Sequence, residues 1–361
     1  MGNSSKTIFR SPLRLSLGLW VAVLGASAPA HSEDIIHTKT VLSDVYTIDR
    51  IYKSMTGPSS TQQIYLSENH KEPELLWIVG YKAVMRGADG LEEMPQDFMC
   101  HSNLDYESWR HRYYYSKGNY GQGRLFTLSQ GQLEVRLPEG FGIPVFSNEP
   151  FSLTTQVLNH NVQNNSFDLR HQIAISYIYD KDITEPLKPL YPSGVYGLVL
   201  LKGEDGYMLI KEPDAQKHGP GCLPGQTASE NFYFDPFGRQ FSGHWVVKPG
   251  REENHTNVTR VMNLPYDTTL HYIAVHLHPF AESIELRDLT ENKSLFKSRV
   301  RPFEGKIGIE HVEYFSNEEG ITVFKDHEYE VVSVYNNTSG VDQDSMAVMY
   351  LYLYDKDFRR P

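Results

Sequence analysis

The sequence predicts an all-β protein made of two jelly-roll or β-sandwich domains in tandem. Short segments rich in Val, Ile, Tyr and Phe alternate with polar residues and stop at clusters of Gly, Pro, Asn and Asp. No segment repeats apolar residues at helical spacing over a useful length, and no longer repeat is present. Many short strands at this spacing are typical of sandwiches and jelly rolls. The clearest predicted strands are 173–179, 197–201, 272–278, 330–335 and 346–354.

Residues 1–30 have the pattern of a secretory signal peptide. Three basic residues precede the apolar stretch 15–28, and residues 28–30 form an Ala-Pro-Ala cleavage site. The apolar stretch is too short for a comfortable membrane span, and no later stretch is long and apolar enough for one. The sequence therefore predicts a secreted or periplasmic protein with no membrane span.

The charge balance argues against nucleic acid as a partner. Removal of residues 1–30 leaves 31 basic and 45 acidic residues, a formal net charge of −14. Such a surface also disfavours binding to anionic membranes. About 330 residues then remain, more than a single hydrophobic core usually serves, so we expect two domains.

The Gly- and Pro-rich segment 218–225 follows a strand-like region and interrupts regular pairing. We therefore place an N-terminal β-sandwich domain at 31–214 and a C-terminal one at 215–361. A second break in composition at 185–192 is either a boundary or a loop that crosses between strands.

Two histidines and a methionine form the strongest candidate site. His276 and His278 lie two residues apart on a predicted strand, so their side chains share one face and can bind one ion. Met346 lies in an alternating run near the C-terminus. Two imidazoles and a thioether form a soft site that suits copper, especially Cu(I). The alternative is a strand with two ordinary histidines, with Met346 filling core space.

The span 271–355 resembles the C-terminal domain of the copper type II, ascorbate-dependent monooxygenases. That family includes peptidylglycine α-hydroxylating monooxygenase and dopamine β-monooxygenase. The shared pattern is His-x-His on a strand, a loop with Gly and Ser at 336–340, and Asp-x-Met opening the last strand. The resemblance implies that His276, His278 and Met346 are catalytic ligands of a copper that binds dioxygen. It also implies hydroxylation of a C–H bond of a small-molecule substrate, with ascorbate or another external reductant.

The N-terminal domain of that family holds a second, electron-transfer copper through three histidines. The family's Leu-Pro-x-Gly-x-Gly turn is matched at 137–142, after which the ligand position falls on Leu158. His160 lies two residues further on, and the family's paired histidines correspond to Cys100 and His101. The resemblance thus implies a second copper at His101 and His160.

Several alternatives for this N-terminal site stay open. Cys100 or His171 could complete it, or the site could be lost in an enzyme that works with one copper. The histidines could also be polar residues satisfied by local hydrogen bonds. Cys100 and Cys222 are the two cysteines of the chain, and in an oxidising compartment they could instead form a disulfide.

The substrate is expected to differ from that of the peptide-processing member. Ala274 stands where that enzyme has an Arg that holds the substrate carboxylate, and Val348 stands where it has an Asn. Loss of the guanidinium removes a bidentate carboxylate contact, so we do not expect a C-terminal glycine as the substrate. Tyr350 is a candidate substrate-binding residue, with simple packing as the alternative.

The leading prediction is a copper-dependent monooxygenase-like enzyme. The first alternative is a non-catalytic protein that uses the same site for copper storage or delivery, and the second is a metal-free interaction domain. The sequence contains no G-x-S-x-G motif, Walker loop, H-E-x-x-H motif or Rossmann fingerprint, which disfavours hydrolase, nucleotide-binding and zincin functions.

Overall fold

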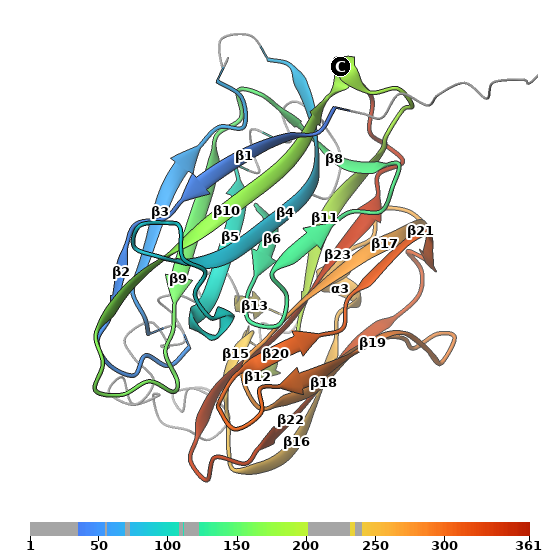
Figure 1. Cartoon of the computed structure of the whole chain (residues 1–361). Coiled ribbons are helices and arrows are strands. Elements are labelled where there is room, and N and C mark those ends of the chain that lie inside the picture. Colours follow the sequence, from blue (N-terminus) through green and yellow to red (C-terminus); the bar gives the residue numbers. More distant parts are fainter. Residues whose placement is uncertain are drawn as a thin grey trace, which may run out of the picture. The chain divides into compact units, whose positions relative to one another are not determined.

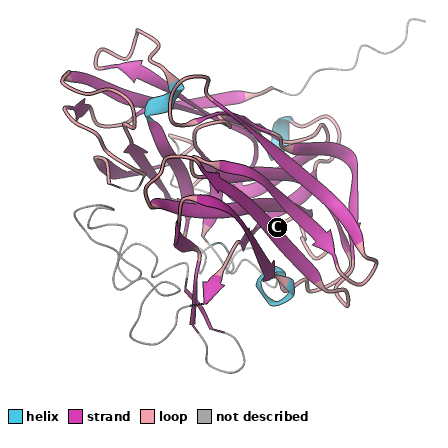
Figure 2. Cartoon of the chain, turned by 90° about the horizontal axis from the view of Figure 1, so that it is seen from below, coloured by secondary structure: helices cyan, strands magenta, loops and turns pink. Residues whose placement is uncertain are grey.

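The computed structural model describes residues 35–54, 56–68, 73–107, 111, 123–200, 232–234 and 240–361. Strands make up nearly all of its regular structure, and helices form only short turns (Figure 2). Within the described residues these turns are η1 (Gln96–Phe98), η2 (Asp180–Asp182) and α3 (Thr259–Met262). The predicted all-β, sandwich-type fold class is therefore confirmed. Among the described residues, no helix is long and apolar enough to cross a membrane.

One eleven-stranded sheet contains strands from both halves of the chain (Figure 1). Its main path runs β1-β10-β4-β8-β11-β23-β17-β21. Off this path, β2 pairs with β10, β7 with β4 and β15 with β23. The strands are β1 (His37–Leu42), β2 (Tyr46–Ile48), β4 (Leu75–Gly87), β7 (Glu134–Arg136), β8 (Phe141–Phe146), β10 (Phe167–Tyr179), β11 (Lys188–Tyr196), β15 (His244–Val247), β17 (Thr268–Leu277), β21 (Phe315–Val323) and β23 (Gln343–Tyr354).

Three smaller sheets complete the described fold. The four-stranded sheet is β3 (Ser59–Ile64), β9 (Phe151–Val157), β5 (Met99–Tyr106) and β6 (Arg124–Leu128). The five-stranded sheet is β16 (Gly250–Asn257), β22 (Tyr329–Asn337), β18 (Ala281–Asp288), β19 (Lys293–Pro302) and β20 (Ile309–Val312). The three-stranded sheet is β12 (Val199–Leu200), β14 (Gln240–Ser242) and β13 (Phe232–Phe234).

Strand β11 joins the two halves of the large sheet. It pairs in parallel with β8 at Lys188 and Pro189, and antiparallel with β23 from Leu190 to Tyr196. The Pro-rich segment 185–192 is therefore largely strand, and residues 34–361 form one compact unit. The predicted boundary near residue 215 and the predicted signal peptide at 1–30 lie outside the described residues, so both stay predictions.

The predicted strand 197–201 is broken in the structure. Gly197 and Leu198 separate β11 from β12, and residue 201 is not described. The Gly197 amide donates to the Ala347 carbonyl at 2.8 Å. A Cβ on Gly197 would lie 3.3 Å from the Cβ of Ala347 and 3.3 Å from the Trp245 ring, so a larger residue would crowd this close approach of the chain to β23.

The core explains why the central strands are so apolar. Strand β23 is buried along almost its whole length, as expected for a strand covered on both faces. On one of these faces, Tyr352 stacks on Phe126 at 5.6 Å, and its hydroxyl donates to the Leu125 carbonyl at 2.8 Å. Phe126 also stacks on Tyr81 of β4 at 5.2 Å. Aromatic contacts thus tie β6 to both β4 and β23.

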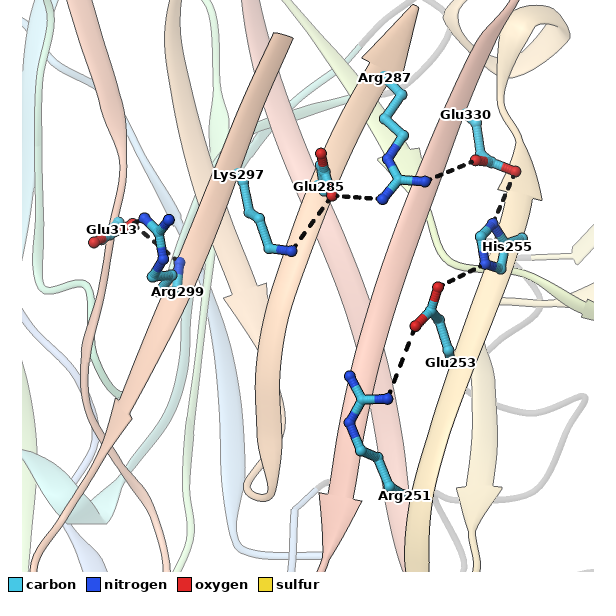
Figure 3. Close-up of polar contacts among 9 residues, drawn as sticks. All are labelled: Arg251, Glu253, His255, Glu285, Arg287, Lys297, Arg299, Glu313 and Glu330. Atoms are coloured by element: carbon cyan, nitrogen blue, oxygen red, sulfur yellow. Dashed lines mark hydrogen bonds and ion pairs between the residues drawn. The ribbon is translucent and has the colours of Figure 1, made fainter. Parts of the chain in front are cut away.

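The exposed side of the five-stranded sheet carries a network of charged side chains (Figure 3). Glu285 accepts a hydrogen bond from Arg287 at 2.9 Å and lies 3.5 Å from the Lys297 ammonium. Burial alone would raise the pKa of Glu285, but hydrogen bonds from Arg287 and Ser294 lower it overall. Exposed ion pairs each contribute about 0–1 kcal/mol, so these pairs add little to the stability of the fold.

Candidate metal centre

Three adjacent strands present possible ligands on one face of the large sheet. His276 of β17 pairs with Val348 of β23, and His244 of β15 pairs with Met346 of β23. Side chains directly opposite each other in an antiparallel pair share a face, and residues two apart on one strand do too. His276, His244 and Met346 therefore lie on the same face.

His101 reaches the same place from β5 of the other half. Its ring centroid lies 5.0 Å from that of His276, which lies 5.3 Å from that of His278. One ring nitrogen from each of the three lies within 4.8 Å of the others. All three side chains are buried. The structure thus groups His101, which the sequence predicted for a separate N-terminal site, with the predicted C-terminal pair.

Neighbouring side chains orient two of these rings. The Nδ1 of His276 lies 3.0 Å from the Ser129 hydroxyl. The Nδ1 of His101 lies 3.2 Å from the Gln156 Oε1, and the Gln156 amide nitrogen donates to the Gly57 carbonyl at 3.0 Å. This second bond turns the Gln156 oxygen toward the ring, so Nδ1 of His101 carries the proton and Nε2 keeps its lone pair. The Nε2 of His101 lies 3.9 Å from the sulfur of Cys100.

The third ring, His278, lies beside a buried carboxylate. Its Nδ1 is 3.0 Å from Oδ2 of Asp344, although the N–H direction is poorly aligned for a hydrogen bond. Within the described chain, Nε2 of His276 and both ring nitrogens of His278 lack a hydrogen-bond partner. A buried polar atom without a partner costs about 1–3 kcal/mol, and a bound ligand would remove this cost.

The electrostatics keep the His101 and His276 imidazoles neutral and Asp344 ionised. Burial lowers the pKa of His101 to about 3 and holds that of His276 well below its usual value. Burial would raise the pKa of Asp344, but the adjacent His278 lowers it overall to about 2. Neutral imidazole and carboxylate are the forms that bind metal ions.

A second group shares one member with the first. His244, His278 and Asp344 each offer a ligand atom within 4.8 Å of the others, and all three are buried. The rings of His244 and His278 meet edge to face, with centroids 5.3 Å apart. Neither His244 nor Asp344 is among the site residues predicted from the sequence. Asp344 belongs to the Asp-x-Met pattern, which was its one signal, whereas no motif in the sequence around His244 indicates a ligand.

The remaining candidates lie around this centre. His160 follows β9, burial lowers its pKa to about 4, and the charges of Asp344 and His278 act on it. It does not share a ligand group with His101 among the described residues. Tyr350 is buried on the same face as Met346 and pairs with Ala274. The predicted disulfide involves Cys222, which lies outside the described residues, so it stays a prediction.

A buried turn from the first half holds β17 in place. Ser129 and Gln132 close this turn through two backbone hydrogen bonds of 3.2 and 3.1 Å. The Gln132 side chain accepts from the Val275 amide at 2.9 Å and donates to the Tyr272 hydroxyl at 3.1 Å. The Ser129 hydroxyl contacts Nδ1 of His276. The turn therefore fixes the strand that carries His276 and ends directly before His278.

His171 belongs to neither candidate ligand group of the described residues. It pairs with Met85 between β10 and β4, and its ring meets Tyr46 edge to face at 6.2 Å. The side chain is fully buried. Burial lowers the pKa of His171 to about 3, and neither ring nitrogen has a hydrogen-bond partner among the described residues. His171 is thus a neutral core residue.

This burial predicts a loss of stability in acid. The unfolded chain protonates His171 near pH 6.5 but the folded chain only near pH 3. The part of the folding stability that depends on a neutral His171 is therefore complete above pH 6.5 and is lost as the pH falls toward 3. At pH 5 the loss should be about 2 kcal/mol. Urea unfolding between pH 7 and 5 should therefore show a shallower pH dependence for His171→Phe. Equal slopes in both proteins would contradict the prediction.

No family model matches the chain, and no curated protein matches it either. Among solved structures, it resembles the STIV MCP with 11% identity and a TM-score of 0.32, over 86% of this chain and 97% of that one. It also resembles PNGase F, a glycosylasparaginase from Flavobacterium meningosepticum, with 7% identity and a TM-score of 0.30, over 88% of this chain and 96% of that one. Similarities this weak carry no functional argument.

Proposed function

We propose that this secreted or periplasmic protein binds copper at His101, His276 and His278, and that it hydroxylates a C–H bond with dioxygen and an external reductant. The observation that carries the proposal is the convergence of three buried imidazoles, one nitrogen of each within 4.8 Å of the others. The resemblance of the span 271–355 to the copper type II monooxygenases supplies the reaction class.

The residues fit copper. Three neutral imidazoles suit copper, zinc, iron or nickel, and a thioether among the donors favours Cu(I). Met346 lies on the face that carries His276 and is itself buried. The unpartnered Nε2 atoms of His276 and His278 are the kind of buried donor that a metal ion would satisfy.

The chain's own contribution is orientation and shielding. Ser129 and Gln156 hold Nδ1 of His276 and His101, so each ring presents Nε2. Burial of all three rings keeps bulk water away from them. When bound, copper would supply the one-electron chemistry that activates dioxygen for hydroxylation.

Oxygen uptake tests this proposal. Full-length protein reconstituted with copper should consume dioxygen when ascorbate is added, whereas metal-free and zinc-loaded samples should not. Copper binding without ascorbate-dependent uptake would overturn the enzymatic part. Failure to bind copper above the level of a dialysis blank would overturn the whole proposal.

The role of Met346 predicts a specific spectroscopic change. Met346→Leu should keep copper but remove the sulfur scatterer from the X-ray absorption spectrum of the reduced protein, because leucine has no donor atom. Met349 is a matched control, since it is also buried on β23 but faces the other side of the sheet. Met349→Leu should keep the sulfur signal. Cys100→Ser must be measured too, because its thiol lies near His101.

The second candidate is copper storage or delivery without catalysis. The observation that favours it is the depth of the site, since His101, His276 and His278 are each at most 7% exposed. A substrate must reach a catalytic copper, whereas a stored ion gains from being enclosed. The oxygen-uptake experiment separates the two functions.

A further inference from the structure

We infer that His244, His278 and Asp344 bind a second metal ion next to the first, so that the two ions share the His278 ring. This inference rests on the proposed copper centre, which supplies the first ion. The inferred arrangement differs from the two separate copper sites expected from the sequence, one in each half of the chain, because the two groups share His278 and so form a single cluster.

The spacing of the donors supports a shared ion. Nδ1 of His278 and Oδ2 of Asp344 are 3.0 Å apart, yet they are poorly aligned for a hydrogen bond. Two donors that each lie about 2.0–2.2 Å from one ion are about 3 Å from each other. The separation therefore suits two ligands of one cation. His244 completes the group, with one ring nitrogen within 4.8 Å of both.

The charge of the site supports it as well. Asp344 is 4% exposed, and no lysine or arginine in the described part of the chain pairs with it. A buried carboxylate needs a compensating positive charge. A divalent cation between Asp344 and the two rings would provide it.

The two positions differ in donor chemistry. The group of His101, His276 and His278 has imidazoles only, with the Met346 thioether on the same face. The second group includes a carboxylate, which suits harder ions such as zinc or iron(II). His278 would then hold both ions, one through each ring nitrogen, and its ring proton would pass to solvent.

Metal counting on the full-length protein tests the inference. Metal-free protein is loaded with Cu(II), with Zn(II), or with Cu(II) followed by Zn(II), then desalted and analysed by mass spectrometry. We expect two ions per chain. Two Cu(II) ions that share an imidazole should couple magnetically, so the electron paramagnetic resonance signal should fall below the copper content. Replacement of one copper by zinc should restore the uncoupled signal.

Variants identify each position. His244→Gln and Asp344→Asn should each leave one ion per chain, bound at the three-imidazole group, and should abolish the magnetic coupling. Asp288→Asn is the matched control, because Asp288 forms a comparable pair with His327 at 2.7 Å outside the cluster. It should keep two ions. Circular dichroism checks that each variant folds. If either His244→Gln or Asp344→Asn fails to fold, the other still tests the second position.

Two results would overturn the inference. One is a single ion at saturation in the wild-type protein, bound through His101 and His276, which would leave the proposed function intact. The other is retention of two ions by both His244→Gln and Asp344→Asn.

Discussion

Replacement of His276 by leucine should abolish copper binding at the three-imidazole group while hardly changing the stability of the metal-free protein. The wild-type ring has one hydrogen-bond partner among the described residues, the Ser129 hydroxyl, and its Nε2 has none. The lost hydrogen bond and the removed buried polar atom offset each other, so the free energy of unfolding should change by less than about 1 kcal/mol. Isothermal titration with copper and urea unfolding measure the two quantities.

A buried histidine on the same strand provides the control. The Nε2 of His271 lies 2.7 Å from the Thr269 hydroxyl, and its Nδ1 lies 3.1 Å from the Asn317 carbonyl. His271→Leu should keep copper binding but lower the free energy of unfolding by about 2 kcal/mol or more. The substitution leaves two hydrogen-bonding groups, the Thr269 hydroxyl and the Asn317 carbonyl, without their partner. A large destabilisation by His276→Leu together with unchanged copper affinity would make His276 a structural residue instead.

Much of the fold could be predicted because strand alternation is a local property. Predicted strands 272–278, 330–335 and 346–354 correspond to β17, β22 and β23 with small shifts at their ends. The position of β11 could not be predicted in this way. Proline normally marks turns, whereas here the Pro-rich segment 185–192 provides most of a strand that β8 and β23 hold from either side.

The candidate site shows the same limit. His276 and His278 could be found because residues two apart on a strand share a face. His244 could not, because its place depends on the register of β15 against β23, which no spacing in the sequence encodes. His101 was found as a candidate but assigned to a separate site, since only tertiary contacts bring β5 beside β17.

The turn that supports His276 gives the second large expected effect. Gly131 lies between the two residues that close this turn and has a φ of +86°, which strains any residue with a Cβ. A Cβ there would also lie 2.6 Å from Cγ2 of Ile309 and 3.2 Å from Cγ1 of Val312. Gly131→Ala should therefore lower the free energy of unfolding by about 3 kcal/mol, from backbone strain and overpacking together. Urea unfolding measures this loss.

The same substitution should also weaken copper binding. Displacement of the turn moves Ser129 away from Nδ1 of His276, and loss of such an orienting contact usually lowers metal affinity about 10–100-fold. Gly140 is the matched control, because its φ is +76° but a Cβ there would meet nothing within 4 Å. Gly140→Ala should lower the free energy of unfolding by about 1 kcal/mol, from backbone strain alone, and leave the copper affinity unchanged. Equal effects of the two substitutions on stability and affinity would mean that the buried turn does not hold β17 in its binding position.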